Sequence, residues 1–592
     1  MDNSEAIISA RNLHVLKQIT KILLLCARQN IAIRSKDDTR SNFIALLEMK
    51  AEDDHILQNH LRSASSNAKY TSPEIQNELL ALLGSELQQK LVHECNNAKF
   101  FGFIADEATD CSNKEQISLC LRYVTQCEID GQLKHGIKED FVQFVKAEST
   151  TGEALANTFI ESLNDMNVAI HQMRGQGYDG AANMKGKNRG VQARILETLP
   201  QAEYTHCTAH VLNLCIVHSC TIPVVRNLMD TVQQISFAFG YSAKRQQLFE
   251  ENLEQNPDRH TLERRQKIVH LCETRWAARA EALTTFLSAY YVAVDVLDEL
   301  GNSGDAKCAG YAASIQRFEF IICLLILEHV LTLTAELSKF LQSKSIDLIQ
   351  AANRAAEVVE QLKAERNDDQ VYAALYEKAV QMSAEVGVLP CKPRSAKRQM
   401  HRNNVEAETP FDYWKRSVYL PFIDHMISEL IDGLLKPKPR FCAQYLLPRM
   451  IPQLTDDVKR AIFDVYSHDI TNNMAVFQHE ITMWELKWRQ TPLIKRPETL
   501  LDTLDSMPCI AYPNLYNVLC ILCVMPVSTA TAERSFSSMR RIKTYLRSTM
   551  TDESFSALAL LHIHREMDIN LDFVVQTFSN KKNRRITLPK FK

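Results

Sequence analysis

The sequence lacks several features that would assign it to a common class of protein. No apolar run approaches the roughly 20 residues that a membrane-spanning helix needs; Ile22–Ala27, Phe320–Leu327 and Val518–Val527 are all short. Met1–Ala6 carries two acids and no apolar stretch, so we expect no signal peptide. We find no G-x-S-x-G nucleophile motif and no P-loop, which disfavours a general hydrolase. We also find no internal repeat.

Neither a strong net charge nor a disulfide framework is present. The 592 residues carry 68 Lys and Arg against 71 Asp and Glu, a formal net charge of -3, so contact with nucleic acid must come from local basic patches. The 16 cysteines are scattered, and a chain with 45% hydrophobic residues can build its own core. We therefore expect reduced thiols in a nuclear or cytosolic protein without a membrane contact.

The first 95 residues predict a helical N-terminal segment without a zinc finger. In Leu13–Ile33 the apolar residues recur at three- and four-residue spacing. No Cys or His pair with zinc-finger spacing occurs here, and we predict no zinc site.

Residues 96–270 predict the first part of an α/β core, a mixed sheet covered by helices. Three short apolar runs predict three consecutive strands, and the residues after them predict alternating helices and strands. The predicted strands are Phe100–Ala105, Ile117–Val124, Phe141–Val145, Val168–Met173 and Tyr204–Cys207, and the helices are Gly152–Asn164, Gly190–Thr198 and Ala209–Ser219.

The later part predicts a helical domain over residues 271–500, with one long helical stretch at Ser345–Met382 and an exposed basic loop at 391–404. Residues 501–570 contain the apolar run 515–527, which suits a buried strand or helix. We read Cys520 and Cys523 within it as core residues. Residues 571–592 form a basic tail.

Three acids stand at positions that suit a metal site. Asp106 directly follows the first predicted strand, Asp179 follows the fourth, and Glu533 lies near the start of a predicted helix. Crowded carboxylates repel each other, and Mg²⁺ or Mn²⁺ removes that penalty. Two such ions can activate a water or a 3′-hydroxyl towards a phosphodiester. Among 71 acids, however, most are solvated surface groups, so spacing alone is weak evidence.

Five segments then add a family resemblance. Between residues 101 and 550 the chain contains, in this order, the segments FGFIADEATDCSNKEQISLCLRYV, GQGYDGAANMKGKNRGVQARI, HCTAHVLNL, CETRWAARAEAL and MPVSTATAERSFSSMRRIKTYLRSTM. They resemble successive blocks of proteins derived from hAT-superfamily transposases, in the group of the zinc-finger MYM-type and THAP-domain relatives. The resemblance implies an RNase H-like core, interrupted by a large all-α insertion domain, whose catalytic and metal-binding acids match Asp106, Asp179 and Glu533. The 354 residues between the last two (533 minus 179) suit that insertion.

The same resemblance implies three DNA-binding residues. Cys207 and His210 match a Cys-x-x-His element, for which we favour a structural or DNA-positioning role of His210 over metal binding. Arg275 and Trp276 match an Arg-Trp element suited to stacking on a displaced base, which is worth about 1–3 kcal/mol. A core role for Trp276 is an equal alternative.

The segment 502–567 matches the dimerisation region of the family, which implies a homodimer or higher oligomer. Leu558, Leu560, Leu561 and Ile563 are the residues expected to cover a partner. Nine basic residues could neutralise DNA phosphates, namely Lys185, Lys187, Arg189, Arg394, Lys397, Arg398, Arg540, Arg541 and Lys543.

Two functions remain open at this stage. Intact acids favour a Mg²⁺- or Mn²⁺-dependent DNA transposase, whereas the missing finger favours a domesticated, catalytically silent nuclear regulator that dimerises. Without the finger, DNA binding should be only weakly sequence-specific. The missing finger itself suggests a truncated gene model, a decayed element or a remainder retained by the host. Nuclear location is expected from the family and from the basic stretches at 391–404 and 581–592.

Overall fold

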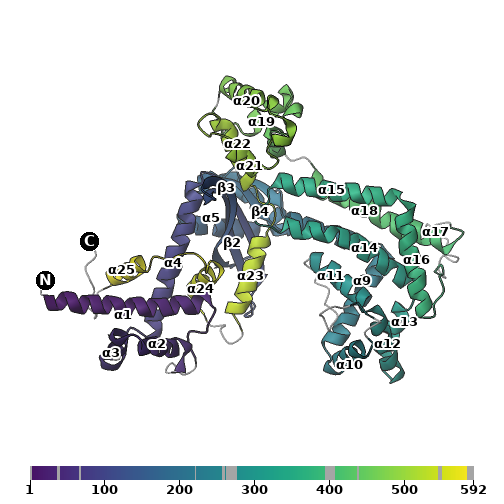
Figure 1. The fold of residues 1–592 in the computed structure, drawn as a ribbon, viewed down its shortest axis with the longest axis horizontal. Coiled ribbons are helices and arrows are strands. Elements are labelled where there is room, and N and C mark those ends of the chain that lie inside the picture. Colours follow the sequence, from purple (N-terminus) through teal and green to yellow (C-terminus); the bar gives the residue numbers. More distant parts are fainter. Residues whose placement is uncertain are drawn as a thin grey trace. The chain divides into compact units, whose positions relative to one another are not determined.

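The computed structural model describes residues 3–35, 40–65, 68–219, 222–256, 260–261, 276–393, 407–436, 439–471, 473–544 and 550–582 (Figure 1). They divide into two compact units. The first joins Met1–His206 to Cys442–Lys592, and the second is Cys207–Phe441.

The first unit is built on a mixed sheet of five described strands in the order β3-β2-β1-β4-β5. β2 pairs antiparallel with both β1 and β3, and β4 pairs parallel with β1 and β5. The hairpin between β2 and β3 turns at Asp130 and Gly131, both with positive φ, as a tight two-residue hairpin turn requires. The prediction of a mixed sheet covered by helices is therefore confirmed. The strands are β1 Phe101–Thr109, β2 Glu115–Ile129, β3 Gln132–Lys146, β4 Met173–Tyr178 and β5 Glu203–His206.

Two predicted strand boundaries are wrong. The fourth strand is Met173–Tyr178 and not Val168–Met173, because Ile170–Gln172 forms a 3-10 turn. Its sequence, MRGQGY, has no β-branched residue, so propensity gave no signal. β1 also continues beyond Ala105 to Thr109, so that Asp106 lies within the strand rather than after it.

Glycines on β1 and β4 create room for a crossing segment. A Cβ atom added to Gly102 would lie 2.1 Å from the carbonyl oxygen of Val524, and Cβ atoms on Gly175 and Gly177 would lie 2.6 and 2.5 Å from Pro526. Gly102 pairs with Gly175, and Ile104 pairs with Gly177. Residues paired on neighbouring strands face the same side, so Val524–Pro526 lies directly on one face of the sheet.

The N-terminal helices pack with the last helices of the chain in the same unit (Figure 1). Gly84 of α4 lies against Ala557 of α24, to which an added Cβ would approach within 2.7 Å. Arg28 and Lys90 donate to the carbonyls of Met567 and Asp568. The segment 1–95 thus shares a core with the chain's end. These helices are α1 Asn3–Arg28, α2 Asn42–Glu52, α3 His55–Ser63, α4 Pro73–Asn97, α24 Asp552–Ile563 and α25 Leu571–Lys581.

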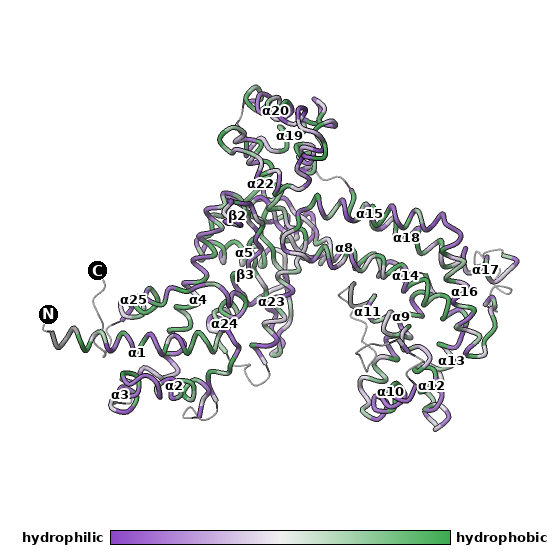
Figure 2. The backbone as a smooth tube through the Cα atoms, viewed as in Figure 1, coloured by the Kyte–Doolittle hydropathy of each residue, from purple (hydrophilic) through white to green (hydrophobic). Residues whose placement is uncertain are grey.

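The remaining helices of the first unit cover the sheet and its edge. Along most helices, hydrophobic and hydrophilic residues alternate, as amphipathic packing requires (Figure 2). The helices are α5 Gly152–Asp165, α6 Ala182–Lys185, α7 Val191–Thr198, α19 Asp456–Val465, α20 Met474–Arg489, α21 Leu500–Asp505, α22 Pro513–Val524 and α23 Ala530–Ile542.

The predicted domain boundaries at 270 and 500 differ from the bounds of the two units. Residues 442–500 belong with the sheet, since Trp484 donates to the Leu446 carbonyl and Glu480 of α20 binds Asn514 of α22. The second unit starts at Cys207, because α8 to α10 pack with later helices of that unit. Periodicity cannot reveal which helices share a core.

All described elements of the second unit are helical. The stretch predicted as one long helix at Ser345–Met382 is broken at Asp368, whose side chain caps the following helix. The elements are α8 Thr208–Ser219, α9 Pro223–Gly240, α10 Ala243–Gln255, α11 Trp276–Ser288, α12 Tyr290–Asn302, α13 Ala306–Ile315, α14 Phe318–Leu341, α15 Leu348–Asn367, α16 Asp369–Glu385, α17 Pro410–Trp414 and α18 Leu420–Leu430, with π-helical turns at Lys415–Tyr419 and Ile431–Leu435. A 3-10 turn at Pro439–Leu446 spans the last residues of the second unit and the first of the rejoined first unit, and the 3-10 turns Ile451–Gln453 and Leu493–Lys495 belong to the first unit.

One described helix, α14, is long and apolar enough to span a membrane by length and composition. Within its most apolar 18 residues, 67% are buried inside the protein, as in the core helix of a soluble domain. The bent pair Ala280–Ser288 and Tyr290–Asn302 passes the same test only if taken together. These helices are weak evidence for a membrane contact.

We predict that Gly102→Ala destabilises the first unit by about 1–3 kcal/mol, because its methyl group would overlap a backbone oxygen that cannot rotate away. Urea unfolding followed by circular dichroism measures this loss. The matched control is Gly136→Ala on β3, where an added Cβ meets nothing within 4 Å. Equal stability of the two variants would show that Val524–Pro526 does not rest on the sheet.

Candidate carboxylate site

The three predicted acids belong to the first unit and lie on elements that meet. Asp106 lies on β1, opposite Ser118 of β2. Asp179 directly follows β4, two residues after Gly177. Glu533 lies in the first turn of α23. Alternation along the strands puts Asp106 on the face of Gly102 and Ile104, which Val524–Pro526 and α23 cover. All three side chains are half-buried.

A buried polar network attaches the start of α23 to the sheet. Thr531 donates to Glu139 Oε2 at 2.6 Å, and Glu139 Oε1 accepts from Arg122 at 2.5 Å. Arg122, which is fully buried, also donates to the carbonyl of Cys523 at 2.9 Å. The network therefore joins β2, β3, α22 and α23 two residues before Glu533. Its hydrogen-bonded partners are 17, 392 and 401 residues apart in sequence, so no local pattern predicts the network.

Two further contacts attach the middle and the end of α23. Ser535 Oγ donates to Ser118 Oγ at 2.7 Å, directly opposite Asp106 in the sheet. Beyond the helix, Lys543 forms an ion pair of 2.5 Å with Asp110, and both side chains are buried. Lys543, predicted as a DNA-contacting residue, is therefore a structural cation, and that prediction is wrong. Asp110 is its counter-ion, with burial tending to raise its pKa and hydrogen bonds from Lys543, Ser112 and Lys114 holding it below its ordinary value.

Neighbouring carboxylates affect the ionisation of Asp106. Burial raises the pKa of Asp106 well above its ordinary value, and the charges of Glu533 and Asp179 raise it further. The Glu107 amide donates to Asp106 Oδ1 at 3.1 Å, which opposes this shift only in part. Asp179 Oδ1 accepts the amide of Ala181, and Thr529 donates to Glu533 Oε1. The fold thus brings the three acids into one electrostatic group.

Glu107 is a fourth acid that sequence reasoning missed. Burial, followed by the charges of Asp179 and Glu115, raises its pKa to about 7. Asn183 Nδ2 lies 3.5 Å from its Oε1 and also donates to the Thr150 carbonyl. The sequence offered one indication of Glu107, which is that two neighbouring acids follow an apolar run. The prediction ended the strand at Ala105 and therefore left both acids outside it.

Within the described ranges, no three His, Cys, Asp or Glu side chains stand close enough to hold a metal ion as they lie. Electrostatic influence reaches further than coordination bonds of about 2 Å, so the two observations are compatible. The oxygen donors themselves are those that Mg²⁺ and Mn²⁺ prefer.

The predicted DNA-binding residues belong to the second unit. His210 lies in the first turn of α8, and its amide donates to the buried Cys207 Sγ at 3.4 Å, so that the Cys207 side chain caps the start of the helix. Trp276 is the first residue of α11, although its side chain lies outside the described atoms. Arg275 lies outside the described residues, as do Arg394, Lys397 and Arg398.

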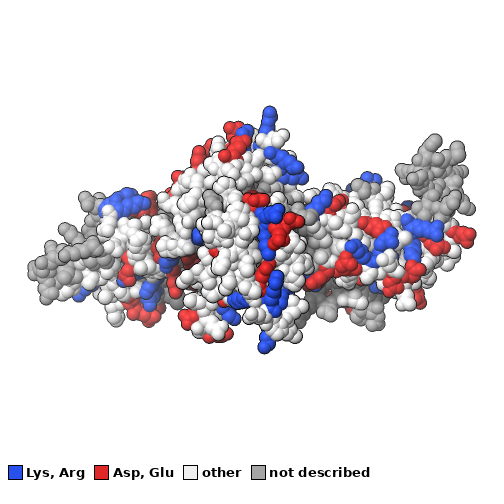
Figure 3. Space-filling model, turned by 90° about the horizontal axis from the view of Figure 1, so that it is seen from above, with Lys and Arg blue, Asp and Glu red and all other residues white. Residues whose placement is uncertain are grey.

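Exposed cations remain close to the second acid in sequence. Lys185, Lys187 and Arg189 follow Asp179 by six to ten residues and are all exposed, as are Arg540 and Arg541 on α23. On the face in Figure 3, however, basic and acidic side chains are interspersed over both units and form no broad basic patch. Any phosphate contact on this face would be local.

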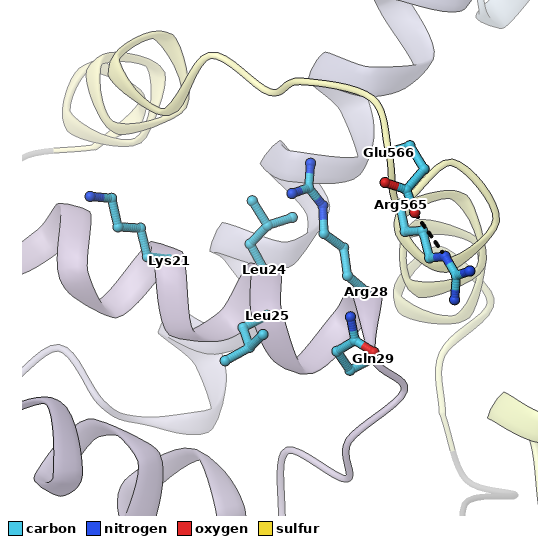
Figure 4. Close-up of a pocket in the computed structure, with 7 residues that line it drawn as sticks. All are labelled: Lys21, Leu24, Leu25, Arg28, Gln29, Arg565 and Glu566. Atoms are coloured by element: carbon cyan, nitrogen blue, oxygen red, sulfur yellow. Dashed lines mark hydrogen bonds and ion pairs between the residues drawn. The ribbon is translucent and has the colours of Figure 1, made fainter.

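Two hollows of the first unit lie away from the acids. A cavity of about 410 Å³ lies beside α1 and the residues after α24, lined by Lys21, Leu24, Leu25, Arg28, Gln29, Arg565 and Glu566 (Figure 4). A second, of about 860 Å³, lies between the ends of α1 and α23. Neither lining includes Asp106, Asp179 or Glu533.

Comparisons with known proteins agree with this arrangement. The family described as "ZMYM1/FAM200, RNase-like domain" matches residues 2–190, so the N-terminal helices and most of the sheet belong to one domain. The "hAT family C-terminal dimerisation region" matches residues 508–567, which include α22, α23 and α24. The human and mouse proteins named "52 kDa repressor of the inhibitor of the protein kinase" are each 27% identical, over 98% of this chain and 78% of their own length.

We expect Lys543→Met to destabilise the first unit by about 3–5 kcal/mol at pH 7, because it leaves the buried Asp110 carboxylate without its counter-ion. Thermal or urea unfolding measures the loss. The exposed control Lys187→Met should stay within about 0.5 kcal/mol of the parent.

This loss should depend on pH. The pKa of Asp110 is lowered in the folded chain, so the ion pair stabilises above the unfolded carboxyl's pKa of about 3.9 and is lost as pH falls through the lower folded pKa. The stability difference between parent and Lys543→Met should shrink below about pH 4. A difference independent of pH would contradict the ion pair.

Asp106→Asn should stabilise the chain in a chelating buffer at pH 7. The pKa of Asp106 is raised, so its penalty is absent below the unfolded pKa of about 3.9 and grows as pH rises towards the folded pKa. We expect a gain in the free energy of unfolding at pH 7 and none near pH 3.5, where the carboxyl is largely protonated in the unfolded chain as well. Asp165→Asn, at the exposed end of α5, is the control; an identical pH profile for both variants would refute the coupling.

Proposed function

This chain is a dimerising protein derived from hAT transposases, and we propose that its RNase-like domain retains a divalent-metal-dependent site for DNA cleavage and strand transfer. The observation that carries the proposal is the electrostatic group formed by Asp106, Asp179 and Glu533. These acids come from β1, from the end of β4 and from α23, across 427 residues of chain (533 minus 106).

The chemistry of the three side chains suits Mg²⁺ or Mn²⁺. Asp106, Asp179 and Glu533 would hold the ions through carboxylate oxygens, and the raised pKa of Asp106 is the electrostatic penalty that a bound cation relieves. When bound, such ions supply Lewis acidity that activates a water or a 3′-hydroxyl and stabilises the leaving oxygen.

Residues around the acids would hold them in place. Tyr204 donates to the backbone carbonyl of Asp179 at 3.1 Å, and the amide of Ala181 donates to the Asp179 carboxylate. Glu533 is held by Thr529 and by the attachment of α23 to the sheet. The exposed Lys185, Lys187 and Arg189 would neutralise DNA phosphates, which gives salt-sensitive and weakly sequence-specific binding.

The helical second unit has the place in the sequence that an insertion between the second and third acids would have, and we propose that role for Cys207–Phe441. His210, Arg275 and Trp276 would contact DNA from this unit, with Trp276 stacking on a displaced base. A nuclear location follows from a DNA substrate.

A catalytically silent, domesticated regulator is the second candidate. Two observations favour it: among the described residues the acids do not converge to coordination distance, and the relatives are named as a repressor. In this role the acids would be remnants, while dimerisation and DNA association would persist.

The deciding experiment measures strand transfer and nicking of a labelled, pre-nicked DNA duplex by the full chain with Mg²⁺ or Mn²⁺. We expect Asp179→Asn to lose more than about 100-fold in rate, as removal of a metal ligand implies, and Asp165→Asn to retain the parent rate.

Activity that EDTA abolishes in the parent chain, together with its loss in Asp179→Asn alone, would support the enzyme. Equal products from all three proteins would indicate a contaminating nuclease. An inactive parent chain that folds and self-associates would sink the enzyme proposal in favour of the regulator.

A further inference from the structure

Between Met474 and Leu486 the outer face of α20 carries no charged side chain, whereas the exposed Arg489 lies in the last turn of the helix. Its exposed residues between Met474 and Leu486 are Ala475, Val476, Gln478, His479, Thr482, Met483 and Leu486. The acids in this stretch, Glu480 and Glu485, are both buried. A solvent-facing helix face normally carries charged residues, so this face has the composition of an interface core.

The apolar members of this face form a stripe. Val476, Met483 and Leu486 are 42%, 46% and 47% exposed, with His479 completing steps of three, four and three residues. These are the alternating a and d spacings of a helix that packs along another helix. Beyond the helix end, Leu493 is 59% and Ile494 87% exposed.

The opposite face of α20 lies on the dimerisation region or the residues directly before it. The Glu480 carboxylate accepts the amides of Asn514 and Leu515 at 3.0 and 3.2 Å, where it stabilises the start of α22. The Trp484 ring lies 5.1 Å from that of Tyr512, and Lys487 donates to the Ser506 carbonyl. The stripe is therefore fixed rigidly to residues 508–567.

The dimerisation region offers little other apolar surface of its own. Leu560 and Leu561 of α24 are buried, and Leu558 and Ile563 pack partly against the same core. The prediction that these residues cover a partner is wrong for Leu560 and Leu561, which face the chain's own core where α24 packs on α4 and β3. In α22, Leu515 and the segment 518–524 are buried as well. Among the described residues of the region, Ile510, which is 94% exposed and lies two residues before Tyr512, is the large apolar side chain that faces solvent.

We infer that the outer face of α20, defined by Val476, His479, Met483 and Leu486 and extended by Leu493, Ile494 and Ile510, is the surface on which a second copy of this chain docks. The inference rests on the self-association in the proposed function and names its surface. A twofold pair is self-complementary, so an uncharged apolar stripe can pack against its own copy without like-charge repulsion. Burial of about 800 Å² on each copy would make a stable dimer, which requires more than the helix alone and so includes the residues after it.

The test measures the dimer dissociation constant of the full chain by sedimentation velocity over a concentration series. The double variant Met483→Glu with Leu486→Glu should weaken the dimer about 100-fold or more, because two central contacts are replaced by like charges. The control is Leu133→Glu on β3, which alters a side chain that is 70% exposed and lies outside the surface. It should leave the constant unchanged.

A charge-swapped partner separates a direct contact from a folding defect. Met483→Lys with Leu486→Lys should also be monomeric, while an equimolar mixture with the Glu variant should restore dimers that about 0.5 M salt weakens. An unchanged dissociation constant in both double variants would overturn the surface but leave self-association intact. A parent chain that stays monomeric at every concentration would overturn self-association itself, and with it this surface.

Discussion

The attachment of α23 to the sheet is the constraint on which the candidate site depends. Thr531, Glu139 and Arg122 fix its start, Ser535 and Ser118 its middle, and the buried pair of Lys543 and Asp110 the residues beyond its end. Charged groups inside a protein are costly unless each is paired and hydrogen-bonded. Because these partners lie on β2, on β3 and directly after β1, the network fixes the position of α23, and therefore of Glu533.

This attachment also explains the sheet's unusual glycines. Val524–Pro526 must pass over β1 and β4 for α23 to follow α22, and only residues without a Cβ leave room at Gly102, Gly175 and Gly177. Those same strands carry Asp106 and lead to Asp179. The close approach thus serves the geometry of the acids, at the cost of a β4 whose sequence has little strand propensity.

The dimerisation region has two distinct structural roles. Its last helix, α24, packs under the N-terminal helices and β3, and so completes the core of the RNase-like domain. Its first helix, α22, supports α20, whose uncharged face points to solvent. Most of the buried surface of the dimerisation region therefore packs within its own chain rather than against a second copy. Dimerisation and the position of Glu533 share one structural element.

The sequence alone determined the mixed sheet, the helical character of the rest and the choice of the three acids as candidates, since local periodicity and short motifs carry that information. It also placed Glu533 correctly at a helix start. It could not determine that Asp106 lies inside a longer strand, because that strand's end depends on its pairing with β2. Nor could it show that Lys543 is a buried cation, since its partner Asp110 lies 433 residues away (543 minus 110), or that Leu560 and Leu561 face their own chain. Only tertiary packing decides which side chains lose their water.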